Sequence, residues 1–81
     1  MKLIFYWTTA WNSTIGFFTI EKSIDGVNFE TIIKVKVEKE NKRYNSVDEM
    51  PSSGTSYYRI KQIDTNGSYF YSSVIKVNIL N

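Results

Sequence analysis

Residues 28–39 read Asn-Phe-Glu-Thr-Ile-Ile-Lys-Val-Lys-Val-Glu-Lys, and this stretch decides the fold class. Every second position carries an apolar or β-branched side chain: Phe29, Thr31, Ile33, Val35 and Val37. Successive side chains of a β-strand point to opposite faces of a sheet, so this period of two predicts a strand with one buried face. We therefore expect a strand over residues 28–39 that packs on a hydrophobic core.

The same alternation recurs on both sides of this segment. Five further strands are expected, over residues 3–9, 17–23, 44–47, 55–64 and 69–80. Asp25-Gly26 and Asn66-Gly67 lie between expected strands, and such pairs favour tight hairpins because they adopt positive φ angles. About six strands and no helical period predict an all-β protein with two packed sheets, a β-sandwich.

Composition supports this fold class. β-branched and aromatic residues make up 36 of the 81 residues, whereas leucine and alanine together number three, so strand formers far outnumber the best helix formers. The inward-facing positions of the expected strands predict the core: Leu3, Phe5, Trp7, Phe18, Ile20, Phe29, Ile33, Val35, Val37, Tyr58, Ile60, Ile75, Val77 and Ile79. A chain of this length predicts a single domain over residues 1–81.

Missing residue types exclude several classes of chemistry. The chain contains no histidine and no cysteine. A Ser-His-Asp or Cys-His nucleophile pair, a thiolate or imidazole zinc site and a disulfide are therefore impossible. The remaining polar residues provide no base tuned near neutral pH. We expect a protein that is not an enzyme and that binds no cofactor and no metal ion.

Charge and hydropathy do not indicate a nucleic acid or a membrane partner. The net charge of +2 is too small to argue for a polyanion. No apolar run approaches the roughly 18 to 20 residues that span a bilayer, and residues 3–7 lack a signal-peptide cleavage site. We expect no nucleic acid partner, no membrane insertion and no signal peptide in this chain.

Three stretches together resemble a known family. They are Trp7-Thr8-Thr9-Ala10, then residues 18–23 (FTIEKS) followed by Asp25-Gly26, then residues 54–64 (GTSYYRIKQID) followed by Asn66-Gly67. In their order and turn positions they resemble the fibronectin type III-like domain of secreted Bacteroidetes proteins. The resemblance implies an immunoglobulin-like sandwich within a larger exported protein, located outside the cell or at its surface. Such domains are non-catalytic spacers or interaction modules, often adjacent to a type IX secretion sorting domain.

The resemblance also assigns roles to single residues. Trp7 is similar to the family's buried tryptophan. The family's core or corner tyrosine, whose hydroxyl bonds backbone, corresponds to Tyr57 by the general fibronectin pattern and to Tyr58 by the alternation through Ile60. The family normally has one more strand before the one that carries Trp7, and this chain begins too late to contain it. We therefore expect the first strand of the family to be missing.

A missing first strand predicts an open sheet edge from Leu3 to Thr9. The free N–H and C=O groups of such an edge invite pairing with another strand. The expected partners are neighbouring domains of the parent protein and a second copy of the chain. That homodimer would form through this edge or by exchange of a terminal strand such as residues 69–80.

The aromatic side chains outnumber the places in so small a core. Exposed rings form stacking platforms for sugars or anchors for protein partners. The candidates for such a surface are Trp11, Tyr57, Tyr69 and Tyr71. A carbohydrate-binding module is therefore the alternative to a spacer or protein-interaction module. A coplanar, exposed pair of rings would favour glycan binding, and scattered or buried rings would favour the spacer.

Two polar segments have ordinary structural explanations. Residues 64–68 (DTNGS) resemble the start of a calcium loop, but the downstream bidentate glutamate is missing and a hairpin explains the same residues. Lys34 and Lys36 share the outward face of an expected strand, where lysines usually prevent a strand edge from pairing with other chains. We expect a ligand at neither segment.

Overall fold

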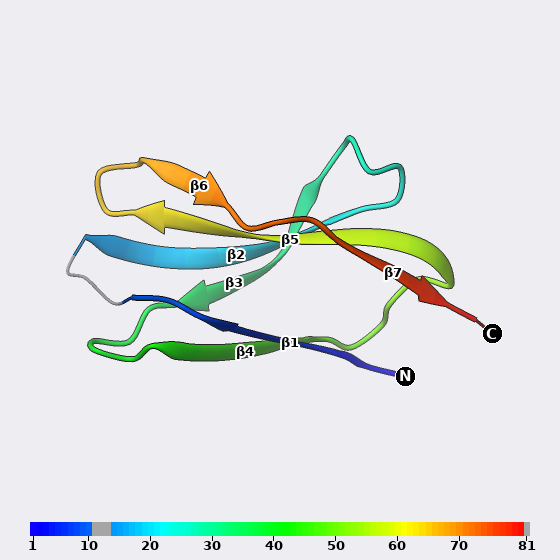
Figure 1. Ribbon diagram of the computed structural model, residues 1–81, viewed down its shortest axis with the longest axis horizontal. Coiled ribbons are helices and arrows are strands. Elements are labelled where there is room, and N and C mark those ends of the chain that lie inside the picture. Colours follow the sequence, from blue (N-terminus) through cyan, green and yellow to red (C-terminus); the bar gives the residue numbers. More distant parts are fainter. Residues whose placement is uncertain (11–13, 81) are drawn as a thin grey trace.

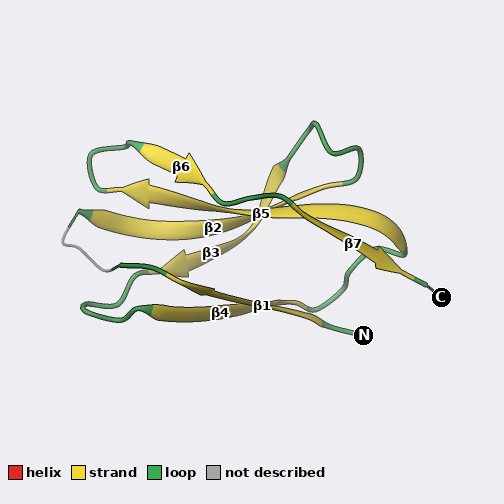
Figure 2. Ribbon diagram, viewed as in Figure 1, coloured by secondary structure: helices red, strands yellow, loops and turns green. Residues whose placement is uncertain are grey.

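The computed structural model describes residues 1–10 and 14–80, and this part of the chain is built from β-strands (Figure 1). The strands are β1 (Leu3–Thr8), β2 (Ile15–Ser23), β3 (Glu30–Lys36), β4 (Arg43–Asp48), β5 (Gly54–Asp64), β6 (Tyr69–Tyr71) and β7 (Ile75–Ile79). Loops and turns connect them, and no helix occurs in the described ranges (Figure 2). The all-β prediction is confirmed.

The strands form two antiparallel sheets. β1 and β4 pair along their whole length, from Leu3 opposite Asp48 to Thr8 opposite Arg43, without a register shift. In the second sheet β2 lies between β3 and β5, and β6 and β7 both pair with β5. Because β7 pairs with the first half of β5 and β6 with its last part, β6 and β7 share one strand position at the sheet edge.

The prediction of one continuous strand over residues 69–80 is wrong, because the chain leaves the sheet between β6 and β7. Ser72 causes this break. Its N–H donates to the Ile60 carbonyl (2.8 Å), while its hydroxyl accepts the Ile60 N–H (2.8 Å) and donates to the Ser73 carbonyl (3.0 Å). A side-chain oxygen thus replaces a backbone acceptor of the ladder. Residues 1–10 and 14–80 thus contain seven strands instead of about six.

β3 is shorter than the expected strand over residues 28–39. The Asp25 carboxylate accepts the N–H groups of Val27 and Asn28 and the side-chain amide of Asn28, each at 2.8 Å. These bonds hold the residues before β3 in a loop, so the predicted tight hairpin at Asp25-Gly26 is a longer connection.

The second predicted turn, at Asn66-Gly67, is confirmed as a hairpin between β5 and β6. Gly67 has a φ of 91°, a left-handed angle that glycine adopts without strain. Its N–H donates to the Asp64 carbonyl (2.9 Å), and the Asp64 N–H donates to the Ser68 carbonyl (2.8 Å). The polar residues of this segment therefore serve a turn.

The two sheets pack on each other through two groups of buried side chains. Phe5, Ile20 and Tyr58 form one group, and Ile15, Phe18 and Tyr44 form the other. The partly buried Trp7 and Ile60 contact both groups and join them. Most of the predicted core is confirmed, while Ile15 and Tyr44 are additional core residues that the sequence pattern did not identify.

Two residues of the predicted core are wrong, and one alternative is decided. Ile75 is 49% exposed. Phe29 belongs to neither core group, and its ring centroid lies 4.0 Å from the guanidinium carbon of the outward Arg59. The reason is a β-bulge between Ile20 and Glu21, which pairs Thr31 with Glu21 and turns this part of the chain to the outer face. Of the two tyrosine alternatives, Tyr58 is the core residue, with 1% of its surface exposed, whereas Tyr57 projects to the opposite face and lies over Gly26. The inside/outside alternation through β5 thus identified the correct tyrosine.

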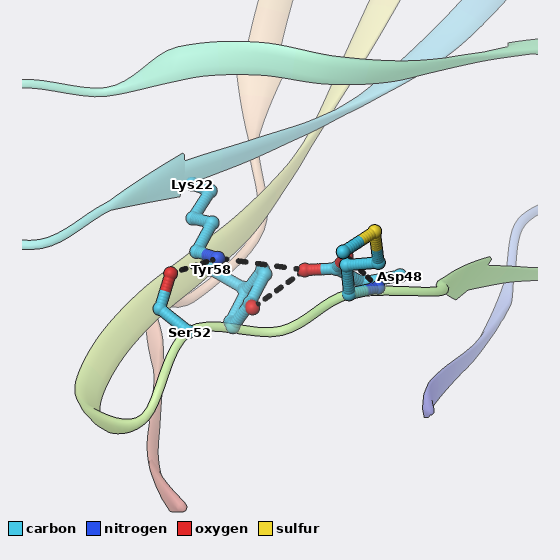
Figure 3. A network of polar contacts seen from close by, with 5 residues as sticks. Lys22, Asp48, Ser52 and Tyr58 are labelled. Atoms are coloured by element: carbon cyan, nitrogen blue, oxygen red, sulfur yellow. Dashed lines mark hydrogen bonds and ion pairs between the residues drawn. The ribbon is translucent and has the colours of Figure 1, made fainter. Parts of the chain in front are cut away.

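A polar network ties the two sheets together at the end of β4 (Figure 3). The Tyr58 hydroxyl donates to Asp48 Oδ2 at 2.8 Å, and the Lys22 ammonium lies 3.6 Å from the same oxygen. Lys22 also donates to the Ser52 hydroxyl at 2.9 Å. The family resemblance implied a backbone acceptor for the tyrosine hydroxyl, and the structure corrects this acceptor to the Asp48 carboxylate.

Candidate interaction surface

One edge of β1 has no partner strand in the part of the chain that the structure describes. The Thr9 N–H donates to the Lys42 carbonyl (2.9 Å) and so points toward the β4 side. Backbone groups alternate in direction along an antiparallel pair. The N–H and C=O groups of Ile4, Tyr6 and Thr8 therefore point away from β4, toward the free edge.

The two-stranded sheet covers only part of the five-stranded sheet. Phe5 of β1 packs on Ile20 of β2 and Tyr58 of β5, and the ring centroids of Phe5 and Tyr58 lie 4.8 Å apart. β1 thus lies over β2 and β5, whereas β6 and β7 occupy the next strand position beyond them. The five-stranded sheet extends past the free edge of β1 by one strand spacing, about 4.8 Å.

Two apolar side chains on this extension face inward and are nevertheless exposed. Phe70 pairs with Gln62, which pairs with the core residue Phe18, and Ile75 pairs with Tyr58. Directly paired residues project to the same face of a sheet, so Phe70 and Ile75 face the inner side. Phe70 is 58% exposed and Ile75 is 49% exposed. Further along β7 the inward residues are covered, because Val77 packs against the core and Ile79 is only 8% exposed. We call the inner face of β6 and the start of β7, marked by Phe70 and Ile75, the shelf.

A small apolar hollow lies between the shelf and β1. It has a volume of about 190 Å³, and its walls include Trp7, Phe18, Ile60 and Phe70. The indole N–H of Trp7 is buried and has no acceptor among the described residues. The hollow therefore combines an apolar wall from both sheets with one unsatisfied donor on the tryptophan that forms part of it.

The surface residues predicted from the sequence lie elsewhere. Trp11 lies outside the described residues. Tyr69 and Tyr71 lie together on the outer face of the five-stranded sheet, because they pair with Ile63 and Lys61 of β5. Tyr57 is partly buried against Gly26, and no ring contact joins it to the other two. The structure thus brings together two of the predicted aromatic residues.

The rings of Tyr69 and Tyr71 do not form a flat platform. Their centroids are 5.5 Å apart, but the ring planes make an angle of 68°. The guanidinium carbon of Arg59 lies 3.8 Å from the Tyr71 ring centroid and 4.0 Å from that of Phe29, and Lys61 Nζ lies 4.2 Å from the Tyr69 centroid. Cations of the same sheet therefore cover ring surface that a sugar would need.

Phe70 and Ile75 are the surface residues that the sequence pattern did not identify. Each lies at an inward position, and for this reason Ile75 was expected in the core. The available signal was the strand count: a first sheet with only two strands cannot cover a wider second sheet. The strand count points to Phe70 and Ile75 only when the position of β6 and β7 beside β5 is known.

The structure offers little that points to other kinds of site. Within residues 1–10 and 14–80, no three acidic side chains gather closely enough to hold a metal ion. The same ranges contain no helix with the length and apolar character needed to cross a membrane.

Comparison with known proteins adds no relative. No protein-family model, no curated protein and no solved structure matches this chain. The grounds for a function are therefore the geometry of the shelf, the free edge of β1 and the sequence resemblance.

Proposed function

We propose that this chain is a non-catalytic protein-interaction module with a fibronectin type III-like sandwich, belonging to a larger protein that is exported or displayed at the cell surface. The arrangement of strands supports the proposed fold. In the immunoglobulin plan the strands B and E share one sheet, while C, F and G share the other. Here β1 pairs with β4, and β2 pairs with β5, which pairs in turn with β6 and β7.

The observation that carries the proposal is the exposure of the shelf. Phe70 and Ile75 occupy inward positions of the five-stranded sheet, yet about half of each side chain is exposed. Contiguous exposed apolar surface on a soluble domain marks an interaction site. The free backbone groups of β1 border the same surface, and a polypeptide can use both features at once.

The glycan-binding alternative receives less support, because it requires a coplanar pair of rings and the planes of Tyr69 and Tyr71 differ by 68°.

A dye that binds exposed apolar surface, 1-anilinonaphthalene-8-sulfonate, tests the proposal. The folded parent should enhance its fluorescence, and the double variant Phe70→Ser/Ile75→Ser should lose most of the enhancement. The matched control is Tyr69→Ser/Tyr71→Ser, which removes two exposed rings from the opposite face and should keep the enhancement.

Thermal unfolding supplies the second measurement. Because Phe70 and Ile75 are about half exposed, the double variant should lose only about 1.5 to 3 kcal/mol, half of what two fully buried side chains contribute, and should stay folded at 25 °C. Equal fluorescence in parent and double variant would contradict the proposal. A double variant that is unfolded at 25 °C would also contradict it, since it would mean that the two side chains belong to the core.

A further inference from the structure

We propose that the free edge of β1 and the shelf together accept one extended strand from another polypeptide, which pairs with β1 and covers Phe70 and Ile75. The inference rests on the proposed interaction function and specifies the chemistry of the partner: a single extended segment with apolar side chains at alternate positions. Four features of the described residues support it.

The first feature is the set of free backbone groups. Ile4, Tyr6 and Thr8 direct their N–H and C=O groups away from β4, and no other strand in the described ranges pairs with them. An extended peptide that adds to such an edge gains main-chain hydrogen bonds without any change in the sheet. The free edge is about three hydrogen-bonding positions long, which suits a short strand.

The second feature is the width of the shelf. β6 and the start of β7 extend one strand position past β1, so the layer above Phe70 and Ile75 has room for one strand. A folded second copy does not fit if the two β1 strands pair antiparallel with both five-stranded sheets on the same side. In that arrangement the shelf of each copy would collide with the five-stranded sheet of the other. The width of the shelf therefore favours a single extended strand as the partner of β1, and not the edge strand of a second folded sheet.

The third feature is the side-chain pattern that the shelf requires. Phe70 and the hollow lie beside Trp7, whereas Ile75 pairs with Tyr58, which contacts Phe5. The partners of Phe70 and Ile75 on β5, Gln62 and Tyr58, are four residues apart, a distance of about 13 Å along a strand. An accepted strand would thus place one large apolar side chain in the hollow and a second one, about four residues away, over Ile75.

The fourth feature is an orphan donor on Trp7, a residue that lines the hollow. Trp7 Nε1 is buried and lacks an acceptor within the described part of the chain. A buried donor without a partner costs about 1 to 3 kcal/mol. A serine, threonine or asparagine oxygen on the accepted strand would satisfy it, so the partner strand should carry a small polar side chain near its aromatic residue.

The other edges of the two sheets lack this combination. β4 lies over the strands β2 and β3, where its Tyr44 is buried with Phe18 in the group against which Val35 packs. β3 is an edge strand that carries Lys34 and Lys36, and such lysines oppose the addition of a further strand. Beside the free edge of β1, the outward side chains Ile4 and Tyr6 are uncharged.

A fluorescein-labelled peptide, Lys-Thr-Phe-Thr-Ile-Thr-Val-Lys, is a suitable probe, with anisotropy as the readout. It should bind the parent, and a peptide of the same composition without alternation, Lys-Phe-Ile-Thr-Thr-Thr-Val-Lys, should bind at least about tenfold more weakly. N-methylation of the alternating peptide at the positions that face β1 should abolish binding, because it removes the main-chain donors.

Two proline substitutions provide a matched pair on the protein. Tyr6 and Asn45 lie opposite each other and direct their N–H groups to the two opposite edges of the β1–β4 sheet. Tyr6→Pro should abolish binding of the peptide and Asn45→Pro should not, while each leaves the bonds between β1 and β4 in place. Tyr6→Thr controls for the loss of the ring and should bind as the parent does.

The outcomes separate this inference from the proposed function. No binding of the alternating peptide up to about 1 mM overturns the inference, and so does equal binding by the N-methylated peptide. If the dye still reports the shelf in either case, the interaction function stands and only strand addition fails. A dimer in sedimentation velocity that Tyr6→Pro dissociates also overturns the inference, because the occupant is then a second copy.

Discussion

The hydroxyl of Tyr58 donates a hydrogen bond of 2.8 Å to the carboxylate of Asp48, and this bond joins the five-stranded sheet to the end of β4. Tyr58 has 1% of its surface exposed and the Asp48 side chain 13%, so the bond is partly shielded from water. Burial raises the pKa of the Tyr58 hydroxyl well above its ordinary value, and the bond to Asp48 raises it further. The same carboxylate oxygen faces the Lys22 ammonium at 3.6 Å.

The variant Tyr58→Phe should destabilise the protein by about 1.5 to 3 kcal/mol, the usual range for a hydrogen bond to a charged group. The ring packing on Phe5 remains, so the loss reports the hydroxyl alone. Urea unfolding measures the free energy. Tyr6→Phe is the control, because Tyr6 is 75% exposed, and it should change the free energy by less than about 0.5 kcal/mol. Equal effects of the two variants would contradict a role for the bond to Asp48.

The raised pKa of Tyr58 predicts a loss of stability at alkaline pH. In the unfolded chain the hydroxyl ionises near its ordinary pKa of about 10, whereas in the folded protein it keeps its proton to higher pH. The hydroxyl of Tyr58 therefore makes its full contribution to the free energy of unfolding below pH 10. Above that pH the contribution declines by up to about 1.4 kcal/mol per pH unit. The stability difference between the parent and Tyr58→Phe, measured by urea unfolding at pH 8 to 12, should shrink above pH 10. A stability difference that stays constant over this pH range would contradict the raised pKa of Tyr58.

The Asp25 carboxylate predicts the opposite dependence, at acid pH. Its hydrogen bonds from the backbone N–H groups of Asn28 and Val27, then from the side chains of Asn28 and Ser23, hold the pKa of Asp25 well below its ordinary value. The unfolded chain binds the proton near pH 4, so the stabilising effect is present above that pH and is lost as the pH falls. Asp25→Ala should lower the Tm at pH 7, and the difference from the parent should shrink below pH 4.

A carboxylate of similar exposure provides the control for Asp25. Glu49 forms an ion pair with Lys2 at 3.5 Å, and both side chains are about two-thirds exposed. Exposed ion pairs contribute little to the free energy of unfolding, so Glu49→Ala should leave the Tm nearly unchanged at pH 7. A larger effect of Glu49→Ala than of Asp25→Ala would refute the role of the loop bonds.

Trp7 should be among the most sensitive positions of the core. Its ring packs edge-on against Phe18 at 5.6 Å and stacks on Tyr44 at 5.9 Å, and it contacts both groups of buried side chains. Trp7→Ala should therefore cost about 3 to 5 kcal/mol. A small domain has about 5 to 15 kcal/mol in total, so the variant should be largely unfolded or close to it.

Circular dichroism during heating measures this loss. The neighbouring substitution Tyr6→Ala is the matched control, because Tyr6 lies on the outer face of the same strand and is 75% exposed. Its Tm should stay close to that of the parent. If Trp7→Ala melts within a few degrees of the parent, the indole does not connect the two sheets energetically.

Local chemistry explains the features that sequence reasoning predicted correctly. The period of two placed Ile33 and Tyr58 on the inner face, because side chains alternate between the two faces of a regular strand. The alternation fails before Ile33, where a β-bulge pairs Thr31 with Glu21. Asn66-Gly67 predicted its hairpin because a positive φ is a property of those residues. The break at Ser72 escaped prediction, since it depends on a bond to Ile60, a residue twelve positions earlier on another strand.

By itself, then, the sequence determined the all-β class, most strand positions, the turn at Gly67 and most of the core, and it excluded chemistry that needs histidine or cysteine. Only the tertiary structure decided that Tyr58 bonds Asp48, that cations cover the Tyr69 and Tyr71 rings, and that Phe70 and Ile75 face inward without a cover. The physical reason is the range of the interactions. Alternation and turn propensity act between neighbours in the chain, whereas burial of an inward side chain depends on how many strands the opposite sheet places above it.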